Sequence, residues 1–130
     1  MESTLTKLEL QPAPIYQYFD ALNAGNYEAV SQLFALDGQL HPPFESAIVG
    51  REAIATYLVA EAKDMKLEPK QTHLEQQTDG FVKVQIQGKV QTPIFGVNVG
   101  WDFLINSDGE ISRVEVKLLA ALQDLLAFKR

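Results

Sequence analysis

The spacing of apolar residues changes once along this chain, near residue 66, and this change constrains the fold more than any other feature of the sequence. In the first part, apolar residues recur at the spacing of one face of a helix. The clearest set is Ile15, Tyr18, Phe19 and Leu22. In the second part, apolar and polar residues alternate one by one, as in a strand with one buried face. The order therefore predicts helices first and strands afterwards.

The first two helices are predicted from their end signals as well as from their apolar faces. Pro12 and Pro14 favour the start of the first helix, which ends within residues 23–26. Asn26 is a good cap for the second helix. The apolar side of this second helix consists of Val30, Leu33 and Phe34.

A break and a third helix are predicted next. Asp37-Gly38 is a turn signal, and the Pro42-Pro43 pair prevents both helix and regular strand pairing. Gly50 then precedes a third helix. Its apolar residues are Ile54, Tyr57, Leu58 and Met65.

Three strands are predicted after residue 66. The first alternates Val82, Val84 and Ile86 with polar residues, after a hairpin turn signal at Asp79-Gly80. The second contains Val97, Val99, Trp101 and Phe103. A turn at residues 107–109 leads to the third, which contains Ile111, Val114 and Val116.

The predicted fold class is α+β, with the N-terminal helices packed on a curved antiparallel sheet and a short C-terminal helix within Leu118–Phe128. We expect residues 1–11 to form an arm and residues 12–130 to form one domain, an ordinary size for a single core. A curved sheet around the first helix leaves a conical hollow between them, where a ligand could bind.

Composition excludes several classes of function. The chain has no cysteine, which rules out disulfides and thiolate chemistry. Its formal net charge is −6 and its 11 Lys and Arg residues are scattered, so we expect no nucleic-acid partner. No signal peptide and no apolar stretch of membrane-spanning length is present, so we expect a cytoplasmic protein.

Few residues are candidates for catalysis. The titratable candidates are His41, His73, Asp37, Asp102 and Tyr18. His41 has no visible partner for acid–base chemistry, and the polar neighbours of His73 indicate exposure. Because strand side chains alternate, Asp102 points away from the face that Trp101 and Phe103 share. The two histidines lack ligand spacing, so no metal site and no catalytic residue is predicted.

Two hydrogen-bond donors lie on elements that face the expected hollow. Tyr18 is on the apolar face of the first helix, and Trp101, the only tryptophan, is on the second strand. Both side chains need a partner when buried, and together they suit one acceptor oxygen on an otherwise apolar ligand. The alternative is that both are core aromatics bonded to the backbone.

Four segments carry a resemblance to a known family. They are residues 18–23 (YFDALN), 38–51 (GQLHPPFESAIVGR), 88–103 (GKVQTPIFGVNVGWDF) and 118–120 (LLA). In combination they resemble the C-terminal domain of the orange carotenoid protein of cyanobacteria and its stand-alone homologs. The resemblance covers residues 12–128 and implies a nuclear transport factor 2-like fold.

The resemblance implies a ligand and its contacts. The ligand would be a ketocarotenoid, canthaxanthin or echinenone, whose keto oxygen accepts hydrogen bonds from Tyr18 and Trp101. The residues implied to line its ring and polyene are Leu22, Met65, Pro93, Ile94, Phe95, Phe103, Val116 and Leu118. The family often has an aromatic residue at the position of Ile94, which weakens the expected stacking there.

The resemblance also implies partners and a role. Stand-alone homologs carry ketocarotenoids to helical carotenoid-binding proteins and quench singlet oxygen, and no enzyme activity is expected. A carotenoid is as long as a domain of this size is wide, so one end stays exposed and calls for a homodimer that shares the pigment, or for transient membrane contact during loading. Two alternatives remain: an isomerase- or dehydratase-like enzyme of the same fold, and a dimerisation or adaptor module whose hollow is filled by side chains.

Overall fold

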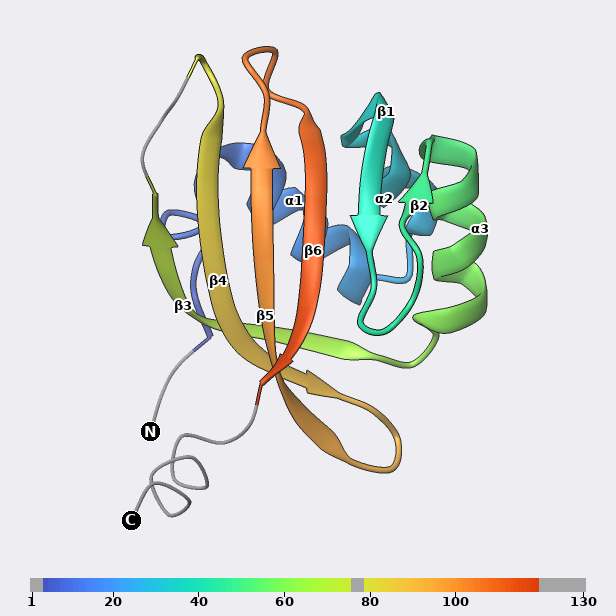
Figure 1. Cartoon of the computed structure of the whole chain (residues 1–130). Coiled ribbons are helices and arrows are strands. Elements are labelled where there is room, and N and C mark those ends of the chain that lie inside the picture. Colours follow the sequence, from blue (N-terminus) through green and yellow to red (C-terminus); the bar gives the residue numbers. More distant parts are fainter. Residues whose placement is uncertain (1–3, 76–78, 120–130) are drawn as a thin grey trace.

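The chain forms three helices and six strands in the part described by the computed structural model, which covers residues 4–75 and 79–119. In chain order they are α1 (Ala13–Asn23), α2 (Tyr27–Gln32), β1 (Phe34–His41), β2 (Ile48–Val49), α3 (Arg51–Glu61), β3 (Lys66–Leu74), β4 (Val82–Gln91), β5 (Gly96–Ile105) and β6 (Ile111–Leu119). The predicted α+β class is confirmed, and Figure 1 shows the helices behind one sheet.

The sheet has the strand order β2-β1-β6-β5-β4-β3. Four of its five pairings are antiparallel, and β1 pairs parallel to β6. The expectation of an antiparallel sheet was therefore wrong for this one pair. Parallel neighbours need a long crossover connection, and here all of α3 and β3–β5 lies between them.

The helix ends follow the predicted signals. Pro12 caps α1, and a second proline lies in its first turn. The Asn26 side chain caps α2 by accepting a hydrogen bond of 3.2 Å from the amide of Ala29. The four apolar residues predicted for the face of α1 are all buried. Caps and apolar spacing thus placed the starts of both helices and the buried face of α1 correctly.

The segment after α2 differs from the prediction. Phe34 is not on a helix but opens β1, and Asp37-Gly38 lies within this strand instead of forming a turn between helices. The pairing of β1 with β6 shifts its register between Phe34 and Gln39, so the strand is irregular there. A Cβ on Gly38 would lie 2.9 Å from the carbonyl oxygen of Ala35, which explains the glycine without a turn. Two strands therefore precede α3, and the predicted order of three helices first was wrong.

A strand was missed after α3. Met65, expected on the third helix, lies beyond its end and precedes β3. Strand β3 (sequence KLEPKQTHL) contains a proline and is mostly polar, so apolar and polar residues show little of the alternation by which a strand is predicted. Its pairing with β4 shifts register between Pro69 and Gln71. Opposite this shift the backbones approach so closely that a Cβ on Gly88 would collide with the carbonyl oxygen of Glu68.

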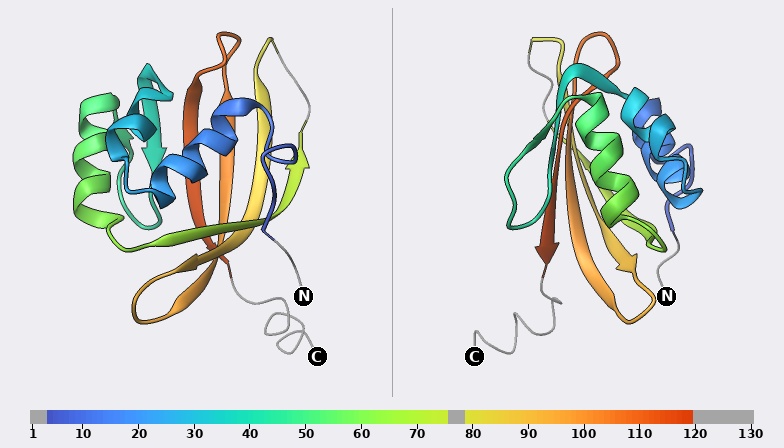
Figure 2. Two further views of the ribbon diagram at one scale, coloured as in Figure 1. Left: turned by 180° about the vertical axis from the view of Figure 1, so that it is seen from behind. Right: turned by 90° about the vertical axis from the view of Figure 1, so that its right-hand side faces the viewer.

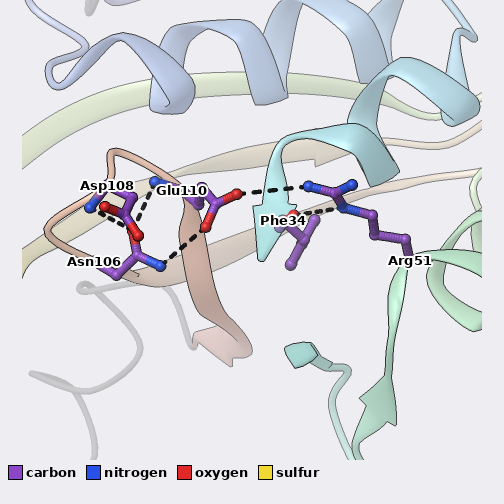
Figure 3. A network of polar contacts seen from close by, with 5 residues as sticks. All are labelled: Phe34, Arg51, Asn106, Asp108 and Glu110. Carbon is purple, nitrogen blue, oxygen red and sulfur yellow. Dashed lines mark hydrogen bonds and ion pairs between the residues drawn. The ribbon is translucent and has the colours of Figure 1, made fainter. Parts of the chain in front are cut away.

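The turns between the later strands are as predicted. Asp79 and Gly80 both have positive φ, 52° and 81°, as a tight hairpin requires. Residues 107–109 form the β5–β6 turn, in which Gly109 has a φ of 78°. The Asn106 side chain accepts hydrogen bonds from the amides of Asp108 and Glu110 and closes this turn (Figure 3).

The same turn is joined to the helical layer by one arginine. Arg51, at the start of α3, donates from Nε to the carbonyl oxygen of Phe34 at 2.8 Å. Its Nη2 lies 3.6 Å from Oε2 of Glu110, and Oε1 of that carboxylate accepts from Asn106 (Figure 3). The network fixes one end of α3 to β1 and to the tip of the β5–β6 hairpin.

All three helices cover the same face of the sheet, and α1 runs across it (Figure 2). The sheet curls toward the helices at the end where β4 and β5 are joined, as the right-hand view shows. The core fills the space between the layers, and Leu10, from the segment expected to be an arm, is buried in it. The Leu5 amide also donates to the carbonyl oxygen of Pro69 at 2.8 Å, so this segment lies along β3.

The C-terminal part of the prediction is only partly covered. Leu118 and Leu119, expected in a short helix, belong to β6. Residues 120–130, the remainder of that predicted helix, lie outside the described residues. Within the described part of the chain, no helix has the length and apolar character needed to cross a membrane.

Candidate functional site

An apolar cavity of about 340 Å³ lies between α1, α3 and the curled end of the sheet. Its volume falls at the lower end of the range typical of small-molecule sites. The residues that line it are Tyr18, Leu22, Leu40, Pro42, Pro43, Tyr57, Leu58, Glu61, Ala62, Met65, Leu67, Val90, Thr92, Phe95, Val97, Val99, Trp101, Val116 and Leu118. The hollow expected between helix and sheet is therefore present.

Tyr18 and Trp101 both line this cavity, and an aromatic cluster holds them in place. The ring of Phe19 packs edge-on against both, with centroid distances of 5.3 Å to Tyr18 and 4.9 Å to Trp101. Phe103 packs edge-on against Tyr18 at 5.1 Å. Such contacts restrict both rings, so the two donors are fixed before any ligand arrives.

The polar atoms of these two rings are free to bond a ligand. Tyr18 is 2% exposed and Trp101 is 1% exposed. Neither the Tyr18 hydroxyl nor the Trp101 Nε1–H bonds to any other residue that the structure describes. Every fully enclosed side-chain nitrogen or oxygen among those residues does have a partner. Both donors must therefore reach the only surface left to such buried residues, the wall of the cavity.

Burial also determines the protonation state of this tyrosine. Removal from water raises the pKa of Tyr18 far above its ordinary value, and the nearby Tyr57 raises it further. The phenol is therefore neutral, and it remains a donor at any physiological pH. A neutral donor pair suits a carbonyl oxygen and gives no stable site for a cation.

The other predicted contact residues divide into two groups. Those that line the cavity are Leu22, Met65, Phe95, Val116 and Leu118. Phe103 does not line it but is buried behind Tyr18. Pro93 and Ile94 are exposed in the β4–β5 loop, next to the lining residues Thr92 and Phe95. The strand alternation placed Phe103 on the correct face, but not at the correct depth.

Sequence reasoning missed most of the wall that α3 and the β1–β2 loop provide. Pro42 and Pro43 were read as a structural break, although the pair is part of the segment that carried the family resemblance. Tyr57 and Leu58 were expected on a helix but not at the site. Leu67 and Val90, which pair across β3 and β4, alternate with polar residues and could have indicated a second inward row.

The mouth of the cavity has a distinct polar arrangement. The Tyr57 hydroxyl donates to Oε2 of Glu45 at 2.9 Å and so ties the β1–β2 loop to α3. Burial, this hydrogen bond and the charges of Glu45 and Glu61 all raise the pKa of Tyr57. The Thr92 hydroxyl donates to the carbonyl oxygen of Phe95 at 2.7 Å. Phe95 and Leu118, which also line the cavity, are 57% and 50% exposed.

The residues considered for catalysis lie elsewhere. Asp102 faces the opposite side of the sheet from Trp101 and pairs with Lys117 at 2.8 Å. His41 is hydrogen-bonded to the Gln39 side chain, and neither it nor the exposed His73 and Asp37 lines the cavity. Among the described residues, no group of three or more His, Asp or Glu side chains is arranged to hold a metal.

A helical layer packed on one curled sheet, with an apolar cavity between them, is the architecture of one class of small domains. Comparison with known proteins identifies the same class. Residues 15–114 match the SnoaL-like domain, and the chain belongs to this family. The fold is nuclear transport factor 2-like, as the resemblance implied.

Similarity to one branch of this fold extends over nearly the whole chain. The chain is homologous to the C-terminal domain of the orange carotenoid-binding protein, with 42% identity to the protein from Synechocystis sp. across 91% of this chain. The orange carotenoid protein of Anabaena (Nostoc) sp. PCC 7120, solved with canthaxanthin, has 35% identity and a TM-score of 0.85 over 98% of this chain. The chain spans about two fifths of each of these relatives, 38% and 42%. A putative polyketide cyclase from Sinorhizobium meliloti is 26% identical, with a TM-score of 0.74, and covers 87% of this chain and all of its own.

Proposed function

We propose that this protein binds a ketocarotenoid non-covalently, with the ketolated end ring in the cavity and the keto oxygen between Tyr18 and Trp101. The observation that carries the proposal is the pair of buried, neutral donors that have no partner among the described residues, both on the wall of an otherwise apolar cavity. The homology to the orange carotenoid-binding protein, and the canthaxanthin in a solved relative, support this ligand class.

The energetics of such a complex follow from the lining. Each neutral hydrogen bond contributes about 1 kcal/mol net. Burial of the apolar ring, at about 25 cal/mol per Å², supplies the larger share of the affinity. Hydrogen bonds to the carbonyl withdraw electron density from the polyene and move its absorption to longer wavelength. Loss of a donor should therefore change the colour more than the affinity.

Partners follow from the exposed end of the pigment. A domain of this length has a radius of gyration of about 14 Å, so a C40 carotenoid extends beyond it. Four exposed apolar residues belong to the cavity rim or to segments next to its lining: Phe44, Ile94, Phe95 and Leu118. We propose that this rim is covered by a second copy of the chain, which shares the pigment, or by a helical carotenoid-binding protein during transfer, and that loading involves transient membrane contact. Singlet-oxygen quenching is the proposed role.

The two alternatives are less well supported. An enzyme would need a titratable group on the cavity wall, and Glu61 at the mouth is the only carboxylate in the described lining. The similarity to a putative polyketide cyclase is the observation in favour of that reading. An adaptor module with a filled hollow is inconsistent with a cavity of about 340 Å³ beside Tyr18.

The test is expression in a host that makes canthaxanthin, followed by visible spectroscopy and size-exclusion chromatography. We expect a coloured protein that absorbs to the red of free pigment and elutes as a dimer. Tyr18→Phe and Trp101→Phe should each reduce the red shift. Tyr16→Phe is the matched control, because Tyr16 is on the same helix but does not line the cavity. A colourless protein from a pigmented host would contradict the proposal.

A further inference from the structure

The cavity contains few polar groups, and among its described lining side chains only two hydrogen-bond donors are available to a ligand. Thr92 and Tyr57 each donate their hydroxyl hydrogen to another part of the protein, Phe95 and Glu45 respectively. The free donors are the neutral ones of Tyr18 and Trp101. A ligand that enters this cavity therefore meets donors for one uncharged acceptor at the inner wall.

The mouth, by contrast, is acidic. Glu61 lines it directly, and the Tyr57 hydrogen bond brings Glu45 to the same place. Both carboxylates are close enough to Tyr57 to raise its pKa, so their negative potential reaches the cavity wall. The described lining contains no Lys, Arg or His that could offset these charges.

We propose that Glu61 and Glu45 act as a charge filter that admits neutral terpenoid ketones and esters and rejects terpenoid and fatty acids. This inference rests on the proposed function, because it concerns the same cavity. A carboxylate that reached Tyr18 and Trp101 would lose its hydration with no cation to pair with. On its way in, it would also pass two exposed carboxylates of like charge at the mouth, whose repulsion acts at short range and weakens with added salt.

Such a filter would be useful because charged molecules can have the same apolar shape as the neutral ligand. Free fatty acids and carboxylated terpenoids match the cavity in hydrophobicity, so apolar contact alone does not exclude them. Discrimination by a repulsive element is a common means of specificity. Glu61 and Glu45 are therefore assigned as specificity-determining residues, and Tyr57 as the positioning residue for Glu45.

A matched pair of ligands tests the filter. Methyl retinoate and retinoic acid share ring, polyene and carbonyl, and differ at pH 8 by one negative charge. Trp101 is the only tryptophan and lines the cavity, so quenching of its fluorescence reports binding of either ligand. We expect the wild-type protein to bind the ester at least about tenfold more tightly than the acid.

Two variants separate the filter from bulk charge. Glu61→Gln should lower the ester-to-acid ratio several-fold. Glu52→Gln removes the same charge from an exposed position of α3 outside the lining, and should leave the ratio unchanged. Equal affinities in the wild type, or equal ratios in the two variants, would overturn the filter.

Loading with canthaxanthin, run in parallel, distinguishes the two proposals. Red-shifted pigment loading without discrimination between ester and acid overturns the filter alone. If neither canthaxanthin nor methyl retinoate binds, the proposed function fails and the filter fails with it. Loss of discrimination at high salt would support the filter, because screening weakens repulsion between partly exposed charges.

Discussion

Replacement of Tyr18 by phenylalanine should have opposite effects on the ligand-free protein and on the pigment complex. The Tyr18 side chain is buried and its hydroxyl bonds to no described part of the protein, so in the ligand-free state only water in the cavity can compensate its desolvation. An unsatisfied buried polar group destabilises a protein by about 1–3 kcal/mol. Because this hydroxyl reaches the cavity wall, where it can be hydrated, we expect Tyr18→Phe to gain only about 0–1 kcal/mol.

For a domain of this size, a gain of 1 kcal/mol corresponds to an increase in Tm of about 3–5 °C. Thermal unfolding of protein expressed in a carotenoid-free host measures this change. In the complex, the same substitution removes one hydrogen bond and should weaken binding about fivefold. Tyr16→Phe, on the same helix, should change neither quantity appreciably. Destabilisation of the ligand-free protein by more than 1 kcal/mol would show that the Tyr18 hydroxyl has a partner in the fold, and would refute the reasoning.

Three further predictions concern pH, the bend of the sheet and its outer face. Burial raises the pKa of Tyr18, so above a pH of about 10 the folded state keeps a proton that the unfolded state loses, and the free energy of unfolding should fall as the pH rises. Denaturant titrations at a series of pH values should show that this free energy falls less steeply with pH in Tyr18→Phe than in the wild type. Gly88→Ala should destabilise by more than about 2 kcal/mol, because its Cβ would meet the backbone of Glu68, whereas Gly96→Ala meets only a movable glutamine side chain; chemical denaturation compares them. Asp102→Asn should leave the absorption spectrum of the pigment complex unchanged and change stability by less than about 1 kcal/mol, because its ion pair lies on the far face of the sheet.

Local signals were sufficient for most helices and strands. The period of the apolar residues located α1, β4, β5 and β6, and Asn26 marked the start of α2 through its side chain. Strand alternation also separated Trp101 from Asp102 correctly. These features depend on residues close in sequence, which is why a single chain reveals them.

Long-range pairing decided what the sequence did not reveal. Strand β1 contains an Asp-Gly pair that is typical of turns, but this pair lies where the register shifts, inside a strand whose residues on both sides pair with β6 from the other end of the chain. Strand β3 has a proline and a polar composition, and its existence depends on β4 beside it. Backbone pairing over such distances overrides local preference, because strand propensity is mostly a matter of neighbours.

The site, too, could be predicted only where it depends on local properties of the sequence. Tyr18 and Trp101 were identified because buried donors require partners, which is a property of the residue types themselves. The contribution of Tyr57, Glu61 and the Pro42-Pro43 pair depends on how α3 and the β1–β2 loop fold over the end of the sheet. No local pattern records that arrangement.

The position of Phe103 links the core to the site. It was expected on the cavity wall, but it packs behind Tyr18, with its ring at 89° to the tyrosine ring. Phe19 packs in the same edge-on manner between Tyr18 and Trp101, at 86° and 89°. The orientation of both donors is therefore a consequence of core packing, and not of contacts with a ligand. A core substitution such as Phe103→Leu, which leaves the lining intact, should loosen Tyr18 and weaken the red shift of bound pigment, although residue 103 does not line the cavity.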